Sequence, residues 1–200
     1  MKWSINLLIS AYSQGYFPMP DPREVAKILW FRPDPRAIIP LDGFHVSRSL
    51  RRRIRQAKYT VSFDGCFLEV MKKCADRPET WINEVFLKSY VELHLEGCAH
   101  SVEIWHQQKL VGGVYGVSLG GAFFAESMFH TQTDCSKLAL YHLVEQMNAC
   151  GYKLLECQFL TPHLSSLGAV EISDTDYLCI LQDALGMHPS VFGSIQTQKY

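Results

Sequence analysis

Three consecutive strand candidates in the middle of the chain constrain its fold more than any other feature. Residues 100–106, 109–119 and 122–130 read HSVEIWH, KLVGGVYGVSL and AFFAESMFH, and they are rich in β-branched and aromatic side chains. The links between them, QQ and GG, are short enough for hairpin turns. The pattern therefore predicts an antiparallel meander.

Helical patterns lie on both sides of this meander. Residues 47–58 place Leu50, Ile54 and Ala57 at the i, i+4 and i+7 spacing of one helix face. Because helices and a further strand surround the meander, we expect an α/β fold, a mixed sheet with helices on both faces. The other expected helices are 4–14, 67–74, 84–96 with Asn83 as N-cap, 135–150 and 174–185, and the other expected strands are 59–63 and 153–160.

A proline-rich and aromatic stretch precedes this region. Residues 15–40 read GYFPMPDPREVAKILWFRPDPRAIIP. Proline lacks the N–H group that a strand ladder uses, so we expect mostly turns here, with a short helix near residues 24–29. Such irregularity suits a boundary, and the sequence predicts a small N-terminal domain at 1–36 and a main domain at 37–200.

Composition bounds the class of protein. Hydrophobic residues make up 48% and charged residues 20% of the chain, and the formal net charge is −1. These values are typical of globular proteins and exclude a general attraction to polyanions. The seven cysteines show no C-x-x-C spacing, which favours reduced thiols in a cytoplasmic protein and no metal site. The apolar stretch INLLIS is too short to span a bilayer.

The predicted helix at 47–58 is strongly basic. No Asp or Glu occurs between Gly43 and Phe63. Because the apolar stripe uses one face of the helix, the cations must cover the other, where they suit a phosphate backbone. A solvated face that pairs with acids elsewhere is an equal alternative on charge alone. Six of the nineteen Lys and Arg of the chain lie here: Arg48, Arg51, Arg52, Arg53, Arg55 and Lys58.

A carboxylate interrupts the last strand of the meander. Strict alternation along 122–130 places Glu126 on one face, and a buried carboxylate needs a partner. An ion pair at the strand end is one explanation, and a carboxylate held beside a hydrophobic side-chain pocket is the other. The alternation assigns Phe124, Glu126 and Met128 to one face and Phe123, Ala125, Ser127 and Phe129 to the opposite face.

The strand expected at 153–160 carries a second polar pair. Glu156 and Gln158 are two residues apart and share a face, whereas Cys157 points the other way. A carboxylate beside a neutral amide can orient a reacting amine, and it can equally be a satisfied polar pair at a sheet edge. The sequence contains no G-x-S-x-G, Walker or G-x-G-x-x-G motif that would indicate another chemistry.

Eight ordered blocks run through most of the chain: AYSQGYFPM, WFRPDPRAIIP, FHVSRSLRR, TWI, GCAHSVEIW, LVGGVYGVSLGGAFFAESMF, CSKLALYHLV and KLLECQFLTPHLSSLGAVEISDTDYL. In sequence and spacing these blocks resemble the leucyl/phenylalanyl-tRNA–protein transferases. The resemblance implies a small N-terminal domain and an acetyltransferase (GNAT)-like domain. It also implies transfer of Leu or Phe from charged tRNA to the N-terminal Arg or Lys of a protein, which marks that protein for degradation by the N-degron route.

The resemblance further implies roles for the motifs. Gln158 would orient the acceptor amine, the Glu156 carboxylate would polarise it, and Glu126 would hold the amine or the ribose end. Two larger groups would bind substrate. The aminoacyl group and terminal adenosine would contact Trp30, Trp81, Tyr90, Phe123, Ser127 and Met128, and the tRNA acceptor end would contact Arg48, Arg51, Arg52, Arg55 and Lys58.

The implied chemistry requires no cofactor. The aminoacyl ester is already activated, and an α-amino group with a pKa of about 7.7–8.0 is partly neutral at cellular pH. The protein mainly has to position two substrates and stabilise a transient oxyanion. We therefore expect Leu- or Phe-tRNA and acceptor proteins as partners, and a cytoplasmic monomer without cofactor, metal or membrane contact.

Three departures from the family pattern bear on rate and acceptor preference. The family usually has Asp at the position of Glu156 and often Asn at that of Thr161, and the N-terminus is short. These departures leave open a tRNA-binding homologue with little activity. A second alternative is an acyl-CoA-dependent small-molecule acyltransferase, although the chain has no Q/R-x-x-G-x-G/A loop for a pyrophosphate.

Overall fold

A seven-stranded mixed sheet forms the centre of the computed structural model, which describes residues 3–21, 23–24, 27–56 and 58–193. Its strand order is β4-β5-β6-β7-β8-β3-β9. Of these neighbouring pairs, β7 and β8 run parallel and the others antiparallel. The strands are β3 (Arg36–Ile38), β4 (Thr60–Phe63), β5 (Ala99–His106), β6 (Lys109–Leu119), β7 (Ala122–His130), β8 (Leu154–Gln158) and β9 (Val170–Ile172).

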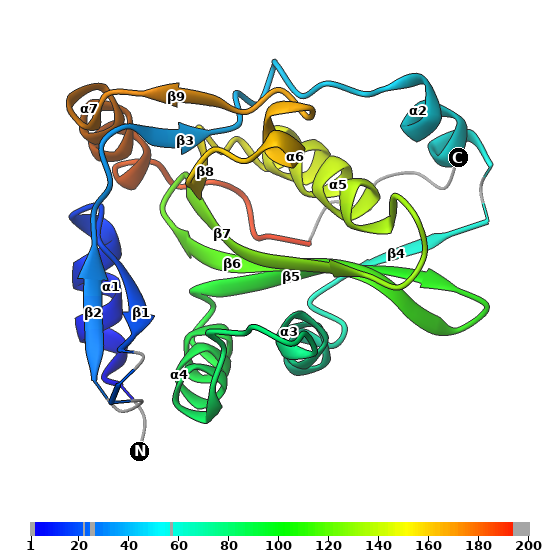
Figure 1. Cartoon of the computed structure of the whole chain (residues 1–200). Coiled ribbons are helices and arrows are strands. Elements are labelled where there is room, and N and C mark those ends of the chain that lie inside the picture. The colour runs from blue at the N-terminus through cyan, green and yellow to red at the C-terminus, as the bar shows by residue number, and fades with distance from the viewer. Residues whose placement is uncertain (1–2, 22, 25–26, 57, 194–200) are drawn as a thin grey trace.

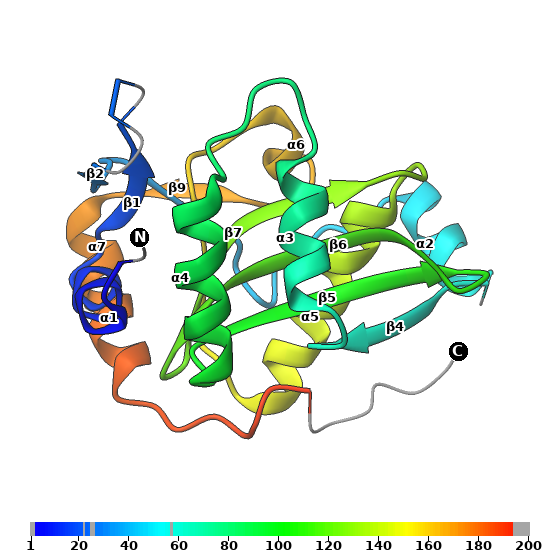
Figure 2. The same cartoon turned by 90° about the horizontal axis from the view of Figure 1, so that it is seen from below.

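Helices cover both faces of this sheet, which confirms the predicted architecture (Figures 1 and 2). α3 and α4 lie against one face, and α5 lies against the other with α2 beside it. The apolar core is divided accordingly into a cluster on the α4 side and a cluster on the α5 side. These helices are α2 (Arg48–Arg55), α3 (Phe67–Ala75), α4 (Glu84–Leu95) and α5 (Cys135–Cys150), followed by α6 (Pro162–Ser165) and α7 (Asp174–Leu185).

The central meander forms as predicted. β5, β6 and β7 pair antiparallel, and each connection between them is a short turn. Gln107 and Gln108 have φ values of 50° and 61°, which is the conformation that a type I′ hairpin turn requires. Gly120 begins the second turn with a φ of 53°, where the absence of a Cβ removes the usual steric cost.

Polar side chains cap the starts of α4 and α7. The side-chain oxygen Oδ1 of Asn83 accepts hydrogen bonds from the backbone N–H groups of Val85 at 2.9 Å and Phe86 at 3.1 Å, at the start of α4. The Ser173 hydroxyl likewise accepts from the N–H of Asp176 at 3.1 Å, at the start of α7. A cap of this kind stabilises a helix by about 1 kcal/mol. The cap predicted at Asn83 is thereby confirmed.

The proline-rich stretch was predicted to be mostly turns, and this prediction is wrong. β1 (Phe17–Pro20) and β2 (Ile28–Phe31) form an antiparallel two-stranded sheet beside α1 (Ile5–Ser13). Pro18 and Pro20 are two residues apart, so the N–H groups that they lack would lie on the same side of β1. A two-stranded ribbon leaves one such side unpaired, which is why both prolines fit. The short helix expected at 24–29 is also wrong, because Ile28 and Leu29 belong to β2, and residues 25 and 26 lie outside the described part of the chain.

Three short elements had no clear sequence signal. β3 and β9 are each three residues long, and they extend the sheet beyond β8. The single-turn helix α6 follows β8, and the Thr161 hydroxyl caps it by accepting from the N–H of Leu164 at 3.2 Å. Such short segments carry too few residues for a periodic pattern. They matter because β3 brings residues from near the N-terminus against β8.

Two global findings complete the fold. No helix in the described residues is long and apolar enough to cross a membrane. All seven cysteines lie in the described residues, and each has a free thiol. The buried ones, such as Cys157, have a raised pKa because burial disfavours the thiolate, so they serve as packing groups rather than nucleophiles.

Candidate active site

The candidate site lies where β7 and β8 stop pairing. The parallel register between these strands ends at Phe124 and Glu156. Beyond that point the two strands share no ladder pairing, and the side chains of Glu126 of β7 and Gln158 of β8 meet at this place, which we call the opening. The Gln158 Nε2 donates to Glu126 Oε1 over 3.5 Å, which is a long and therefore weak hydrogen bond. A contact of this kind can yield readily to a bound substrate.

A β-bulge places Glu126 in this opening. Tyr115 of β6 pairs with Ser127, and the next residue, Gly116, pairs with Ala125. Glu126 is therefore the extra residue of β7 and has no partner across the ladder. Bulges bend a strand and redirect its side chains, and they are over-represented near active sites.

The bulge also corrects the predicted faces of β7. Ser127 was expected on the face opposite Glu126, but its hydroxyl accepts a hydrogen bond from Arg77, just after α3, at 2.7 Å. Met128 was expected on the same face as Glu126, but it packs with the cluster on the α5 side, as does the fully buried Phe123. Strict alternation is therefore wrong after Glu126, because the extra residue shifts the period by one.

Two tyrosine hydroxyls hold the Glu126 carboxylate. Tyr12 of α1 donates to Oε1 at 2.7 Å, Tyr90 of α4 to Oε2 at 3.4 Å, and the two hydroxyls are 2.5 Å apart. Burial raises the pKa of Glu126 to about 8, and the negative charge of Glu156 adds to the rise, while the tyrosine hydrogen bonds oppose it. Glu126 therefore exchanges its proton near neutral pH, as a general acid or base must.

An aromatic wall continues from this cluster. The rings of Tyr90 and Phe86 stack at 5.6 Å, and Trp81 meets Phe86 edge-on at 4.9 Å. Trp30 of β2 is half-buried against the same cluster of the core. Tyr115 lies 6.2 Å from Tyr90 between ring centroids, and its buried hydroxyl has no hydrogen-bond partner among the described residues. Trp30, Trp81 and Tyr90 thus lie on the Glu126 side of the sheet.

Glu156 lies beneath the opening rather than in it. Its carboxylate is 0% exposed and accepts from Arg36 Nη1 at 2.9 Å and from the backbone N–H of Gln158 at 2.9 Å. Arg36 also donates to the carbonyl of Gly15, and its guanidinium lies 4.2 Å above the ring of Tyr177. Burial raises the pKa of Glu156, and the Arg36 charge opposes the rise. The expected direct contact of Glu156 with a substrate amine is not available in this geometry.

The backbone of Gln158 explains how Glu156 acts on the site. Gln158 has a φ of 61°, a left-handed conformation that is uncommon for a residue with a side chain and costs about 1–3 kcal/mol. The hydrogen bond from its N–H to Glu156 stabilises this conformation. Strand alternation therefore ends at Gln158, and its amide turns toward Glu126. Glu156 positions Gln158, and Arg36 positions Glu156.

The basic helix presents its arginines to solvent. Arg48, Arg51, Arg52 and Arg55 are exposed, and among the described residues none of the four lies within ion-pair distance of a carboxylate. The inward Arg53 differs, with its Nε 3.9 Å from Asp134. The described residues therefore supply no acid partner for these four arginines, and the solvated face that the sequence predicted as one alternative is what the structure shows. Lys58 lies 5.0 Å above the ring of Tyr59, and Ala57 of the expected apolar stripe lies outside the described residues.

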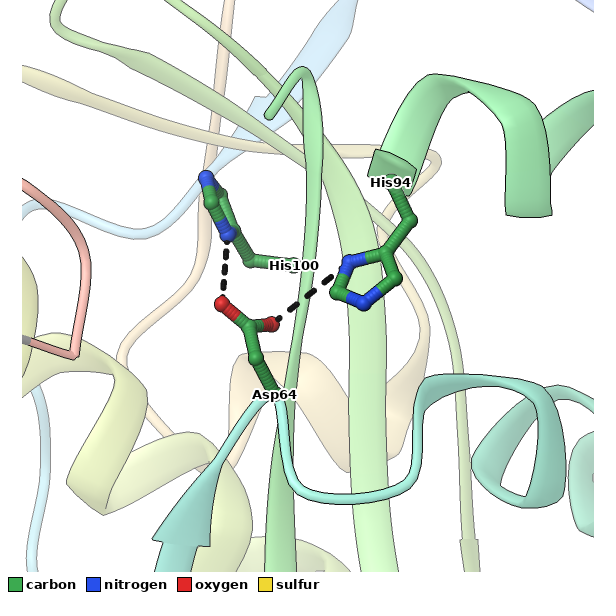
Figure 3. Close-up of side chains that lie close together, drawn as sticks. All are labelled: Asp64, His94 and His100. Atoms are coloured by element: carbon green, nitrogen blue, oxygen red, sulfur yellow. Dashed lines mark hydrogen bonds and ion pairs between the residues drawn. The ribbon is translucent and has the colours of Figure 1, made fainter. Parts of the chain in front are cut away.

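A second polar cluster consists of Asp64, His94 and His100 (Figure 3). Asp64 is 2.8 Å from Nδ1 of His100 and 3.9 Å from Nδ1 of His94, so the three could approach a cation. However, Nδ1 of His94 is 2.8 Å from the carbonyl of Ala99. A carbonyl only accepts, so that nitrogen carries hydrogen and offers no lone pair to a metal. We interpret the cluster as a junction that ties α4, β5 and the loop after β4 together.

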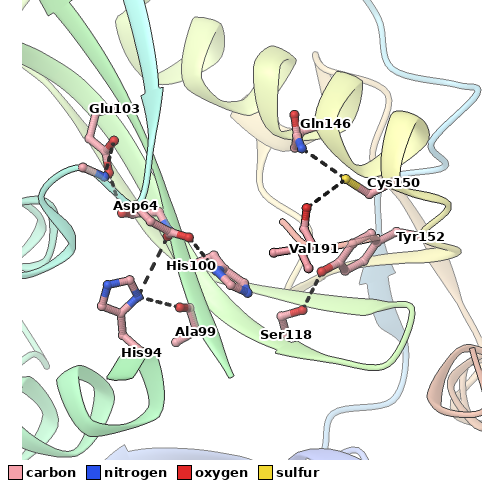
Figure 4. A network of polar contacts seen from close by, with 12 residues as sticks. Asp64, His94, Ala99, His100, Glu103, Ser118, Gln146, Cys150, Tyr152 and Val191 are labelled. Atoms are coloured by element: carbon pink, nitrogen blue, oxygen red, sulfur yellow. Dashed lines mark hydrogen bonds and ion pairs between the residues drawn. The ribbon is translucent and has the colours of Figure 1, made fainter. Parts of the chain in front are cut away.

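This junction belongs to a wider set of structural contacts at the same end of the sheet (Figure 4). The buried Glu103 accepts from the hydroxyl of Ser101 and from the N–H of Gly65 at 3.1 Å. The hydroxyls of Ser118 and Tyr152 are 2.9 Å apart. Each of these polar groups is satisfied, and a satisfied buried group is what a structural role requires.

Comparison with known proteins decides between the functional classes. The family model described as leucyl/phenylalanyl-tRNA protein transferase matches residues 38–182, and the model of its N-terminal domain matches residues 1–34. The chain belongs to this family. The resemblance found in the sequence blocks is thereby confirmed.

Two curated relatives carry the transferase name. The leucyl/phenylalanyl-tRNA–protein transferase of Ruegeria sp. (strain TM1040) is 52% identical over 185 residues, which are 92% of this chain and 88% of the relative. That of Cereibacter sphaeroides (strain ATCC 17023) is 54% identical over 180 residues, which are 90% of this chain and 84% of the relative.

Solved structures give more distant likenesses. The chain matches L-PGS from Bacillus licheniformis with a TM-score of 0.43 and 15% identity, over 80% of this chain and 55% of that one. It matches a GCN5-related N-acetyltransferase from Kribbella flavida with a TM-score of 0.45 and 13% identity, over 71% of this chain and 58% of that one. The chain therefore spans a little over half the length of these structures.

The site of this transferase draws on both matched ranges, which sequence reasoning missed. Tyr12 belongs to the N-terminal range, whereas its partners Tyr90 and Glu126 belong to the second. Arg36 falls between the two ranges and reaches Glu156. A sequence signal for these residues did exist, because Tyr12 and Arg36 lie in AYSQGYFPM and WFRPDPRAIIP, two of the blocks that carry the family resemblance. Nothing in those blocks alone indicates which carboxylate each residue contacts.

Proposed function

We propose that this protein transfers a leucyl or phenylalanyl group from tRNA to the N-terminal Arg or Lys of acceptor proteins. The observation that carries the proposal is the pair Glu126 and Gln158 at the opening between β7 and β8, in a chain of this family. The names of the relatives support transfer from leucyl- or phenylalanyl-tRNA to protein. Acceptors modified in this way would enter the N-degron route of degradation.

The reaction needs one bond to form and one to break. The acceptor α-amine attacks the carbonyl carbon of the aminoacyl ester, a C–N bond forms, and the C–O bond to the tRNA ribose breaks. The proton lost by the amine is finally balanced by the ribose oxygen, which leaves as a hydroxyl. No oxidant, reductant or external energy source is required, because the ester is already activated.

Gln158 and Glu126 would act on the amine. The Gln158 amide oxygen can accept from the attacking N–H and so direct the nitrogen lone pair at the ester. Glu126 would hold the ammonium form of the acceptor as a carboxylate and take its proton, because its pKa of about 8 lies close to that of an α-amine. Glu156 would contribute through the backbone of Gln158 rather than by contact with substrate.

The face of the sheet on which each of the remaining residues lies decides whether it would contact substrate. Trp30, Trp81 and Tyr90 would bind the aminoacyl group and terminal adenosine, since they share the Glu126 side. Phe123 and Met128 would support β7 from the α5 side instead of touching substrate. Ser127 would bind through the same hydroxyl that now accepts from Arg77.

The unpaired arginines of α2 would hold the tRNA. Arg48, Arg51, Arg52 and Arg55 present guanidinium groups with no protein carboxylate among the described residues to satisfy them, and Lys58 would extend the patch. Guanidinium groups bind phosphate with two parallel hydrogen bonds. Because aminoacyl-tRNA is present in the cytoplasm, the proposal places the protein there. A monomer would suffice, since the residues named here come from one chain.

The decisive experiment supplies both substrates. The protein is incubated with tRNA charged with labelled Leu or Phe and with peptides that begin with Arg, Lys or Ala. We expect label on the Arg and Lys peptides and none on the Ala peptide. Bound tRNA without label on any peptide would contradict the proposal and support a tRNA-binding homologue. Acetyl-CoA serves as the control ligand, because a rise in thermal midpoint with acetyl-CoA would support an acyl-CoA-dependent enzyme.

A further inference from the structure

A groove between α2 and α5 combines apolar and cationic groups away from Glu126. It has a volume of about 340 Å³. Val46, Ile54 and the ring of Tyr141 supply apolar surface, and the side chains of Arg51 and Arg55 complete the lining. α2 packs directly on α5 here, so these two helices supply four of the five lining residues, and the segment just before α2 supplies Val46. A groove with rigid walls is a better candidate for selective binding than a loop surface.

The two arginines of the groove are free to bind a ligand. Arg51 and Arg55 are four residues apart on α2, so their side chains lie one above the other on the helix surface. Both are exposed, and among the described residues neither lies within ion-pair distance of an acid. Arg53 on the inner side of the helix is held by Asp134 and by the Tyr59 hydroxyl at 3.2 Å, which fixes the helix in place.

The mixture of groups selects the class of ligand. A free phosphate would need the arginines but not the apolar wall, and an aliphatic ligand would need the wall but not the arginines. A nucleotide presents a flat ring and a phosphate together. In a duplex the faces of the ring are covered by stacking, so an aromatic wall serves an unpaired nucleotide. The volume lies at the small end of ligand sites, which suits a single base.

We propose that this groove holds one unpaired nucleotide from the 3′ end of the tRNA, with its base against Tyr141 and its phosphates on Arg51 and Arg55. The inference rests on the proposed function and extends it from phosphate attraction to contact with a base. The 3′ end is the source because it is the single strand joined to the aminoacyl group.

The test compares two uncharged RNA hairpins that share a stem and loop. One hairpin ends in a short single-stranded 3′ overhang, and the other is blunt. Fluorescence anisotropy measures the affinity of each for wild type, Tyr141→Leu and Tyr141→Phe. We expect Tyr141→Leu, which removes the ring, to weaken binding of the overhang hairpin on the order of tenfold and to leave the blunt hairpin unchanged. Tyr141→Phe keeps the ring and should bind both hairpins as wild type does.

Two outcomes would overturn the base contact. If Tyr141→Leu loses affinity equally for both hairpins, Tyr141 supports α2 or contacts the loop of the RNA. If Tyr141→Leu binds the overhang hairpin as tightly as wild type does, no base binds in the groove. The phosphate contacts are tested separately with Arg51→Gln and Arg55→Gln together. Replacing both arginines should reduce the magnitude of the slope of log K against log salt by about one unit per arginine, because each arginine would neutralise one phosphate. An unchanged slope would show that the phosphates do not bind to Arg51 and Arg55.

Labelled transfer to the Arg peptide by wild type separates this inference from the proposed function. Transfer with no overhang-dependent loss in Tyr141→Leu overturns the groove assignment alone. An overhang-dependent loss without any transfer by wild type overturns the proposed function and leaves the nucleotide site standing. Displacement of the overhang hairpin from wild type by an acidic peptide as effectively as by a single-stranded oligonucleotide would show that charge alone is recognised, and would also overturn the inference.

Discussion

At the scale of single residues, a carboxylate that sits between two tyrosines distinguishes the opening from the rest of the sheet. Glu126 is held by Tyr12 and Tyr90, and burial raises its pKa to about 8. Glu156 is also buried but is neutralised by Arg36. Two carboxylates on neighbouring strands thus have different environments, and only Glu126 is placed to exchange a proton with a ligand in the opening.

The raised pKa of Glu126 predicts how stability depends on pH. The folded protein holds this proton up to a pH of about 8, whereas the unfolded chain releases it near its ordinary value of about 4.5. Between these values the folded state binds more protons, so the contribution of Glu126 to stability falls as pH rises. We expect the thermal midpoint of wild type to fall relative to that of Glu126→Gln by on the order of 5 °C from about pH 5 to about pH 9.

Thermal unfolding followed by circular dichroism at several pH values checks this expectation. The comparison is between the two proteins at each pH, so other titrating groups cancel. Parallel curves for wild type and Glu126→Gln would show that the carboxyl titrates as an ordinary surface group. A curve that rises with pH for wild type relative to the variant would reverse the sign and would also contradict the assignment.

Gln158 allows a test of catalysis without a change in tRNA binding. Its amide faces Glu126, and the arginines of α2 lie on a different element. Gln158→Ala should therefore lower turnover by on the order of a hundredfold, within the range that one positioned group supplies, and leave tRNA affinity within about twofold. Gln158→Glu is the matched control, because it keeps the length of the side chain but loses the amide. A parallel loss of tRNA affinity would show that Gln158 is structural.

At the scale of elements, the bulge of β7 determines which side chains reach the opening. Gly116 of β6 lies opposite the bulge, and a Cβ at this position would lie 2.2 Å from the carbonyl oxygen of Phe124 and 2.5 Å from a ring carbon of Phe123. Contacts this short require backbone movement. The absence of a side chain at Gly116 is therefore a condition for the local geometry of β6 and β7, and so for the direction of Glu126.

We expect Gly116→Ala to destabilise the protein by about 2–4 kcal/mol, because either β7 or the Phe123 ring must move. Urea unfolding measures the loss, and labelled transfer measures the effect on the site. Gly186→Ala is the matched control, since a Cβ there would meet its nearest heavy atom at 3.6 Å and its φ of −77° suits any residue. Equal stability of the two variants would contradict a packing role for Gly116.

The sequence determined most of the elements but not the faces of β7. The meander, α4, α5 and α7 follow from hydrophobic period, hairpin turns and caps that are local properties of the chain. The bulge at Glu126 depends on a pairing choice between β6 and β7, which no period reveals. The partners of Glu126 and Glu156 could not be predicted from local sequence patterns either. Tyr12 and Arg36, which contact these carboxylates, are more than a hundred residues away in the chain.

At the scale of the whole molecule, the N-terminal segment is joined to the main sheet through the site itself. Tyr12 of α1 contacts Glu126, and Arg36 of β3 joins Glu156 to the carbonyl of Gly15. Arg36 is 1% exposed, so its charge depends on Glu156 and on the carbonyl for compensation. On the surface, Arg32 and Asp174 form a second link between the segment and α7.

Replacing the buried link should affect the whole molecule, and replacing the surface link should not. Arg36→Met leaves Glu156 buried without a counter-charge, which costs about 3–5 kcal/mol, whereas Arg32→Met should cost about 1 kcal/mol or less. Urea unfolding compares the two variants, and hydrogen exchange in α1 should become faster in Arg36→Met alone. Adding Glu156→Gln to Arg36→Met should recover part of the loss. No recovery would mean that the charge on Glu156 is not the cause.

The contacts of Tyr12 and Arg36 set the order in which this enzyme can become competent. Tyr12 and Glu126 are 114 positions apart, and Arg36 and Glu156 are 120 apart. A chain leaving the ribosome presents α1 first and β8 near the end, so the proton-exchanging carboxylate acquires its donors and Gln158 its support only after both ends of the fold have met. An incomplete fold can already expose the arginines of α2, but Glu126 and Gln158 then lack the contacts that hold them.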